Sequence, residues 1–183
     1  MITIALAGVL AAIAVPNMRS FILNGRMAGT ANDLLRAVQS ARSQAISLQR
    51  TVAVCASANP TSADPTCGGT FSGWIVFEDT NTSWQRESGE RVIEARVAPD
   101  ELNFVKDSDE DAVISFASTG FRTLTAGHVG ATRILMCDSR GVAPLGDNSA
   151  ARVLFIESTG RPRIERLQEK VSVVADDLGS CPP

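Results

Sequence analysis

The sequence contains no tyrosine, only one histidine and few aromatic residues, and these absences restrict the chemistry that it can carry. A Ser-His-Asp triad would have to use His128, which lies in the glycine-rich stretch TAGHVGA, and no GxSxG nucleophile elbow occurs. The nucleotide-binding motifs GxxxxGK[ST] and GxGxxG are missing too. We therefore expect a surface loop histidine, no enzymatic activity and no cofactor.

Metal-ligand spacing is also absent, because no two cysteines form a CxxC pair and there is a single histidine. The acidic stretch DSDEDA places Asp107, Asp109 and Asp111 at the spacing of a calcium loop. An EF-hand needs a glycine and an acid where Ala112 and Ser118 stand. The pattern favours a solvated acidic turn over a calcium site completed by other loops, and we expect no bound metal.

The four cysteines are even in number and follow an apolar leader, which favours two disulfides in an oxidising compartment over four buried thiols. Three pairings are possible. Proximity in the sequence favours Cys55 with Cys67 and Cys137 with Cys181. On the chain-entropy model, such loops would contribute about 3 and about 4 kcal/mol to stability.

The chain opens on the apolar run MITIALAGVLAAIAVP, which no lysine or arginine precedes, so it is unlike a secretory signal peptide. As a helix, fifteen residues span about 22 Å, less than the roughly 30 Å hydrocarbon core of a bilayer. Extension through residues 21–23 would make up the difference. Small residues at four-residue spacing suit packing against other helices, and a plain membrane anchor is the alternative. We expect residues 1–23 to form a hydrophobic helical segment.

A second pattern follows the run, because apolar residues recur there at alternating spacings of four and three. These residues are Met27, Ala31, Leu34, Val38, Ala41, Ala45 and Leu48. They predict an amphipathic helix over 24–49, joined to the opening run as one helix of nearly fifty residues.

From residue 51 to 183 the pattern changes to short β-branched and aromatic segments separated by Gly, Pro, Asn and Asp. Their spacing favours antiparallel hairpins over crossovers. The predicted strands are 51–56, 73–78, 91–97, 102–105, 112–117, 132–137, 152–157, 163–167 and 171–174. The sequence thus predicts an α+β fold, with one long N-terminal helix packed on an antiparallel β-rich domain that covers residues 24–183.

Five segments, in order, resemble the GspH/FimT group of type IV pilin-like proteins, the minor pilins and pseudopilins. They are MITIALAGVLAAIAVPNM, SGWIVFED at 72–79, ISFASTG at 114–120, RILMCDSRG at 133–141 and VLFIESTGRPR at 153–163. The first is similar to the second part of the hydrophobic pilin helix with its proline. The other four are similar to motifs of the globular domain, and the likeness covers nearly the whole chain.

The resemblance implies a single-pass precursor in the bacterial inner membrane with a periplasmic domain. A prepilin peptidase cleaves such a precursor, which then joins a type IV pilus or a type II secretion pseudopilus, where the helices of major and minor subunits pack together. Family members begin with a basic leader, a Gly, a Phe that becomes N-methylated and then a Glu. None of these precedes Met1, so we expect the chain to start inside this motif.

The stretch GRPRIER resembles the GRxR motif by which FimT-type pilins bind double-stranded DNA in natural transformation, and matches it at Gly160, Arg161 and Arg163. Arg166 and Lys170 add positive charge. In a strand Arg161 and Arg163 would share one side, whereas in a loop the three arginines would be free to converge. Pro162 favours an exposed edge or loop. Guanidinium groups there would hold phosphates.

Two other functions stay open at this point. In the first, the arginines pair with Glu157, Glu165 and Glu169 along a solvated edge strand, and the protein is a purely structural pseudopilin that primes or caps a type II secretion filament. In the second, it is a periplasmic binding protein tethered by its helix.

Overall fold

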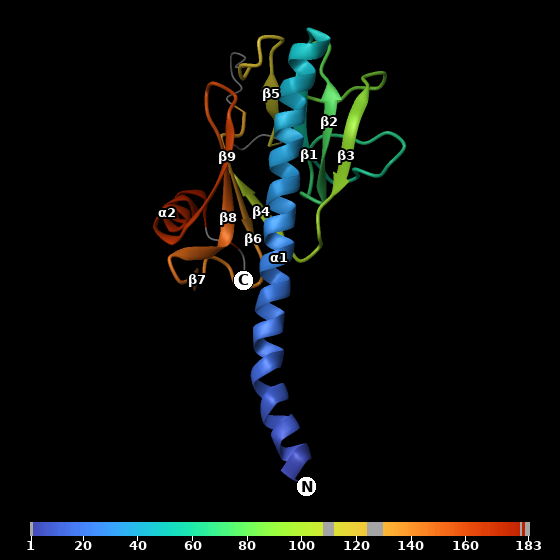
Figure 1. The fold of residues 1–183 in the computed structure, drawn as a ribbon. Coiled ribbons are helices and arrows are strands. Elements are labelled where there is room, and N and C mark those ends of the chain that lie inside the picture. The colour runs from blue at the N-terminus through green and yellow to red at the C-terminus, as the bar shows by residue number, and fades with distance from the viewer. Residues whose placement is uncertain (1, 108–111, 124–129, 180, 182–183) are drawn as a thin grey trace.

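The computed structural model describes residues 2–107, 112–123, 130–179 and 181. One uninterrupted helix, α1 (Ile2–Leu48), forms the N-terminal quarter of the chain and confirms the expected long helix. Figure 1 shows its N-terminal half projecting from the globular part and its C-terminal half lying along the sheets. Among the described residues, no helix has a stretch both long and apolar enough to cross a membrane.

The apolar stripe of α1 faces the core as its spacing predicts. Met27, Leu34 and Val38 are almost fully buried, and Ala31, Ala41 and Ala45 bring the helix backbone close to the sheets. Towards the projecting half, apolar side chains of the helix are exposed to solvent: Phe21 is 73% and Met18 60% exposed. The helix is therefore one-sided where it contacts the domain and apolar where it leaves it.

Two antiparallel sheets pack against α1, one on each side of it (Figure 1). The first sheet has the order β3-β2-β1-β5, formed by β1 (Val52–Ser57), β2 (Gly73–Glu78), β3 (Val92–Val97) and β5 (Ile114–Phe116). The second has the order β4-β6-β8, with β7 and β9 both paired to the far edge of β8. Its strands are β4 (Asn103–Lys106), β6 (Arg133–Cys137), β7 (Pro144–Leu145), β8 (Asn148–Ile156) and β9 (Pro162–Leu167).

Successive residues of a strand point to opposite faces of its sheet, and α1 covers one face of each sheet. The apolar residues on the other face need another element to cover them. Val54 and Val76 of the first sheet and Leu154 of the second join α1 in the main core. The outer face of the first sheet, with Phe77, packs under Trp84 of the loop that joins β2 to β3. The outer face of the second sheet packs under a short helix, α2 (Gln168–Leu178).

The prediction of a strand over 171–174 is wrong, because these residues belong to α2. β-branched valines favoured a strand, but Val171, Val174 and Ala175 recur at helical spacing and bury against the outer face of the second sheet. Burial outweighs their modest helix propensity. The two-residue strand β7 was also not predicted.

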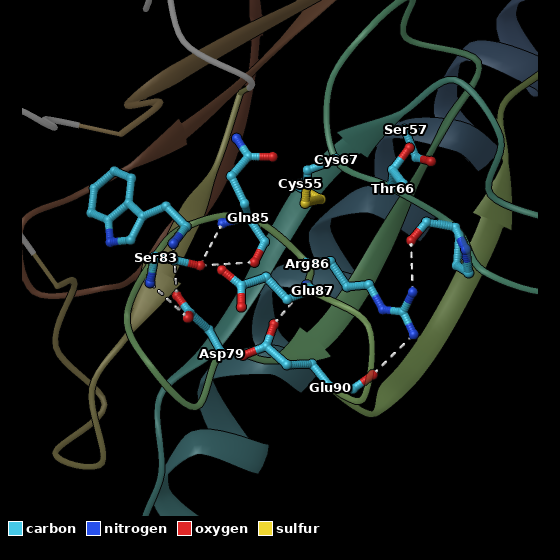
Figure 2. The surroundings of a disulfide bond; sticks show 12 residues. Cys55, Ser57, Thr66, Cys67, Asp79, Ser83, Gln85, Arg86, Glu87 and Glu90 are labelled. Atoms are coloured by element: carbon cyan, nitrogen blue, oxygen red, sulfur yellow. Dashed lines mark hydrogen bonds between the residues drawn. A yellow bond between two sulfur atoms is a disulfide. The ribbon is translucent and has the colours of Figure 1, made fainter.

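Both expected disulfides are formed. Cys55 in β1 is bonded to Cys67, with the two Cα atoms 5.5 Å apart, and Cys137 in β6 is bonded to Cys181, with 6.0 Å between the Cα atoms. The first ties the loop after β1 back to the sheet, as Figure 2 shows. The second fastens the segment after α2 to β6, and thereby holds α2 against the second sheet.

Candidate nucleic-acid interface

The tight turn between β8 and β9 carries the GRxR residues. The N–H of Gly160 donates to the carbonyl of Glu157 at 2.9 Å, and the N–H of Glu157 donates to the carbonyl of Arg161 at 3.1 Å. Gly160 has a φ of +78°, and a Cβ there would lie 2.6 Å from the carbonyl oxygen of Gly120. The turn therefore requires glycine for both its conformation and its close packing.

Beyond the turn, β9 is an edge strand, as Pro162 led us to expect. It pairs with β8 alone, with Pro162 opposite Ile156 and Arg163 opposite Phe155. Arg161, Arg163, Arg166 and Lys170 are all exposed. The structure thus presents the three arginines along one border of the second sheet and Lys170 in the first turn of α2.

Arg163 has partners within the protein. Its guanidinium lies 4.4 Å above the ring of Phe155, a cation–π contact. Its Nη1 is 3.3 Å from a carboxylate oxygen of Glu165, and its Nε is 3.8 Å from one of Glu157. Lys170 also pairs with Glu165, at 3.3 Å. These two cations are therefore partly neutralised, as the structural alternative expects.

Glu165 holds this cluster together from a nearly buried position. Burial alone would raise the pKa of its carboxyl, but the N–H groups of Leu167 and Arg166 and the ammonium of Lys170 keep the pKa below the usual value. The carboxylate accepts hydrogen bonds from the N–H of Arg166 at 3.0 Å and of Leu167 at 3.2 Å. Glu165 is thus ionised and fixed at neutral pH, and it binds cations of its own chain.

Arg161 and Arg163 have different surroundings. Arg161 lines a groove of about 470 Å³ together with residues of α1, whereas Arg163 lies on the ring of Phe155, a residue packed with the α2 cluster. Neither Arg161 nor Arg166 has an ion pair or a side-chain hydrogen bond with any residue that the structure describes. Arg161 and Arg163 therefore do not converge, because one lines the groove beside α1 and the other stacks on Phe155.

Further cations lie near Arg166. Burial, with the charges of Arg166 and Arg140 beside it, lowers the pKa of Arg152 on β8, and Asp138 opposes this shift. Arg140 binds Asp138 and donates to the side chain of Asn24 on α1 at 2.8 Å. No sequence pattern marked Arg140 or Arg152 as a candidate binding residue. The flank of the domain between α1 and β9 is therefore richer in arginine than the GRxR motif alone suggests.

Of the candidate calcium-loop residues and the candidate histidine, the structure describes Asp107 alone. Asp107 accepts a hydrogen bond from the N–H of Thr132 at 2.9 Å and lies 3.4 Å from Nε of Arg133, so it supports the junction of β4 with β6. Asp109, Asp111 and His128 lie outside the described residues. Within the described residues, no three metal-ligating side chains come together.

Residues 30–160 match a protein family described as type II transport protein GspH. This chain belongs to the GspH family. No curated protein matches the chain with significance. Its fold is similar to that of the type IV minor pilin FimU of Pseudomonas aeruginosa PAO1, in a crystal structure in space group P21. The TM-score is 0.51 at 17% identity, covering 79% of this chain and 92% of that chain.

A second crystal structure of FimU, in space group P65, is similar at 19% identity and a TM-score of 0.47, covering 75% of this chain and 90% of that one. Family and fold together identify the GspH-family chain as a minor pilin or pseudopilin, a structural subunit that associates with other pilins or pseudopilins.

Proposed function

We propose that this GspH-family protein is a minor pilin that binds double-stranded DNA along β9 and acts as a receptor in natural transformation. One observation carries the proposal: Arg161, next to the start of the edge strand β9, and Arg166 within it are exposed, and no described carboxylate pairs with either. An exposed guanidinium without a partner is available to a phosphate, which it binds in a charge-assisted, bidentate manner.

The expected affinity is low for one subunit. Two phosphate contacts give a slope of about −1.8 in a plot of log affinity against log salt, so a rise from about 50 to 200 mM weakens binding about twelvefold. Arg163 and Lys170 add less than full contacts, because a phosphate must compete there with Glu157 and Glu165. Useful capture of DNA then depends on several subunits or on cations of a neighbouring pilin.

The proposal also assigns a place in the cell. Residues 1–23 form the hydrophobic segment, held in the bacterial inner membrane until assembly, and residues 24–183 form the periplasmic domain. A prepilin peptidase acts on the precursor, and exposed Met18, Phe21 and Ile22 on α1 then pack against other pilins in the filament.

An electrophoretic shift assay tests the function. The full chain in a neutral detergent should retard a duplex at 50 mM salt, and the double variant Arg161→Ala, Arg166→Ala should not. Arg50→Ala, Arg91→Ala is the matched control, because it also removes two exposed arginines, both of which are paired with Glu78 in the first sheet. Equal loss of binding in the control would mean that only net charge matters and would contradict an interface on β9.

A purely structural pseudopilin of type II secretion is the second candidate, and specific contacts favour it. The packing of Gly160 on Gly120 and the ion pairs of Arg163 and Lys170 account for much of the motif without a ligand. The family's description as a type II transport protein agrees with this role. No retardation of the duplex by the unmodified chain at 50 mM salt would select this candidate.

A further inference from the structure

A groove separates α1 from the turn that begins β9. It is lined by Gln39, Arg42, Ser43 and Ile46 of α1 and by Arg161 and Pro162, and its volume of about 470 Å³ lies within the range of small-ligand sites. We infer that this groove binds a DNA phosphate between Arg42 and Arg161. The inference rests on the DNA-binding function proposed above and adds α1 to the interface.

Arg42 is already held in position without a ligand. Its Nε donates to the carbonyl oxygen of Gly120 at 2.8 Å, and the side chain is half-buried. Its two terminal nitrogens have no hydrogen bond or ion pair with the residues that the structure describes. One edge of the guanidinium is therefore used to fix the side chain, and the rest is available. A cation fixed in advance loses little conformational entropy when an anion binds.

The same carbonyl also positions Arg161. Two turns have matching hydrogen bonds and the shared sequence Ser-Thr-Gly: in residues 117–121 the N–H of Gly120 donates to Ala117 at 2.8 Å, as Gly160 does to Glu157 at 2.9 Å. Gly160 packs directly on the carbonyl of Gly120, which Arg42 binds from α1. The turn that carries Arg161 is thereby held against the segment of α1 that carries Arg42.

The charge of the groove favours an anion. No Asp or Glu occurs on α1 after Asp33, and Asp33 belongs to the opposite flank, where it lies 3.5 Å from Arg96 of β3. In the turn, Glu157 is paired with Arg163. An anion in the groove would meet two guanidinium groups, the amide of Gln39 and the hydroxyl of Ser43, which are the donors that phosphate oxygens accept from.

The length of the surface points to a polyanion. Arg161 and Arg166 stand at the two ends of β9, about 16 Å apart along an extended strand. At 3.4 Å per base pair, this distance spans roughly five steps of a duplex. Arg42 and Arg161 would hold one phosphate, and Arg166 would hold another further along. Because Arg42 and Arg161 share one phosphate, two phosphates are contacted in all and the expected salt slope stays at about −1.8.

Two isosteric changes on the same helix test the groove. Gln39→Glu places a negative charge in it, whereas Gln44→Glu adds the same charge to α1 at a residue that does not line it. With the full chain in detergent and a fluorescent 20-base-pair duplex, Gln39→Glu should weaken binding about fivefold at 50 mM salt, the size of one exposed ion-pair interaction. Gln44→Glu should change it less than about twofold, since salt screens distant charges.

The possible results distinguish a failure of the inference about the groove from a failure of the proposed DNA binding. Equal effects of the two variants, with DNA binding still abolished by Arg161→Ala, Arg166→Ala, would overturn the groove and leave the function standing. A chain that binds no duplex would overturn both. If Gln39→Glu leaves DNA binding unchanged but reduces crosslinking to a co-expressed major pilin in cells, the groove contacts a neighbouring subunit and the inference is wrong.

Discussion

Two regions of this molecule differ in whether their charged side chains are buried and paired or exposed and unpaired. In the loop of residues 79–90, which covers the first sheet, Asp79 and Glu90 are buried, and Arg86 has a nearly buried side chain (Figure 2). In the turn of residues 157–161 and along β9, Arg161 and Arg166 are exposed, with no partner among the described residues. The charged residues inside the loop of residues 79–90 stabilise the fold, whereas Arg161 and Arg166 are available to bind a ligand.

Buried charges of the first loop are satisfied by backbone groups. The carboxylate of Asp79 accepts from the N–H groups of Ser83 at 3.0 Å and Trp84 at 3.2 Å, and Glu90 accepts from Thr80 at 2.7 Å. Arg86 pairs with Asp64 and donates to the carbonyl of Glu90 at 3.2 Å. These bonds let a loop without regular structure cover the first sheet, much as α2 covers the second.

The largest expected effect concerns the backbone of the arginine-bearing turn. Gly160→Ala should lower the free energy of unfolding by about 3 kcal/mol, because it adds both left-handed strain and a clash with Gly120. Gly146→Ala is the control: its φ of +65° adds strain alone, with no atom within 4 Å, so about 1 kcal/mol is expected. Urea unfolding measures both, and equal losses would mean that Gly160 is not tightly packed.

The contrast between buried, paired charges and exposed, unpaired ones is tested by removing one arginine from each of the two regions. Arg86→Ala should cost about 2 kcal/mol of stability, because the carbonyls of Pro65 and Glu90 lose their donor. Arg161→Ala should change stability by less than about 0.5 kcal/mol, since its side chain is exposed and unpaired. Thermal unfolding monitored by circular dichroism gives both values. Comparable losses would break the division between folding charges and binding charges.

The smallest effects are opposite pH dependences. Burial raises the pKa of Asp79, against the N–H groups of Trp84 and Ser83 that lower it, so its contribution to stability is present below the unfolded pKa and is lost as pH rises through the folded one. The pKa of Glu165 is lowered, so its contribution is present above the unfolded pKa and is lost as pH falls through the folded one.

Unfolding between pH 3 and pH 7 compares Asp79→Asn and Glu165→Gln with the unmodified chain. Relative to that chain, Asp79→Asn should gain stability as pH rises, and Glu165→Gln should gain it as pH falls, each by less than about 1 kcal/mol. Parallel profiles for the two variants would contradict the assigned environments.

Sequence patterns predicted the elements with strong local signals. The stripe from Met27 to Leu48 determined the buried face of α1, and the disulfides followed from short separations. The valines of α2 led to a wrong prediction of a strand. β-Propensity reflects how well a side chain packs on a half-buried sheet, and here valines are buried by a helix. Pro162 correctly indicated an edge strand.

The candidate site was only partly predictable. The residues of GRxR and a pairing of arginines with Glu165 were visible in the sequence, but not that Arg163 and Lys170 would be paired while Arg161 and Arg166 stay unpaired. Arg42 carried no signal of its own in the sequence, because it belongs neither to the apolar stripe nor to the GRxR motif. Its approach to Arg161 depends on Gly120, which brings together α1 and two turns that are distant in sequence.

The most direct test of the account is the salt dependence of duplex binding by the full chain. The account predicts a log–log slope of about −1.8, falling to about −0.9 in Arg166→Ala, because one of the two phosphate contacts is lost. A slope that is the same in both proteins would contradict it, since Arg166 would then make no contact with DNA.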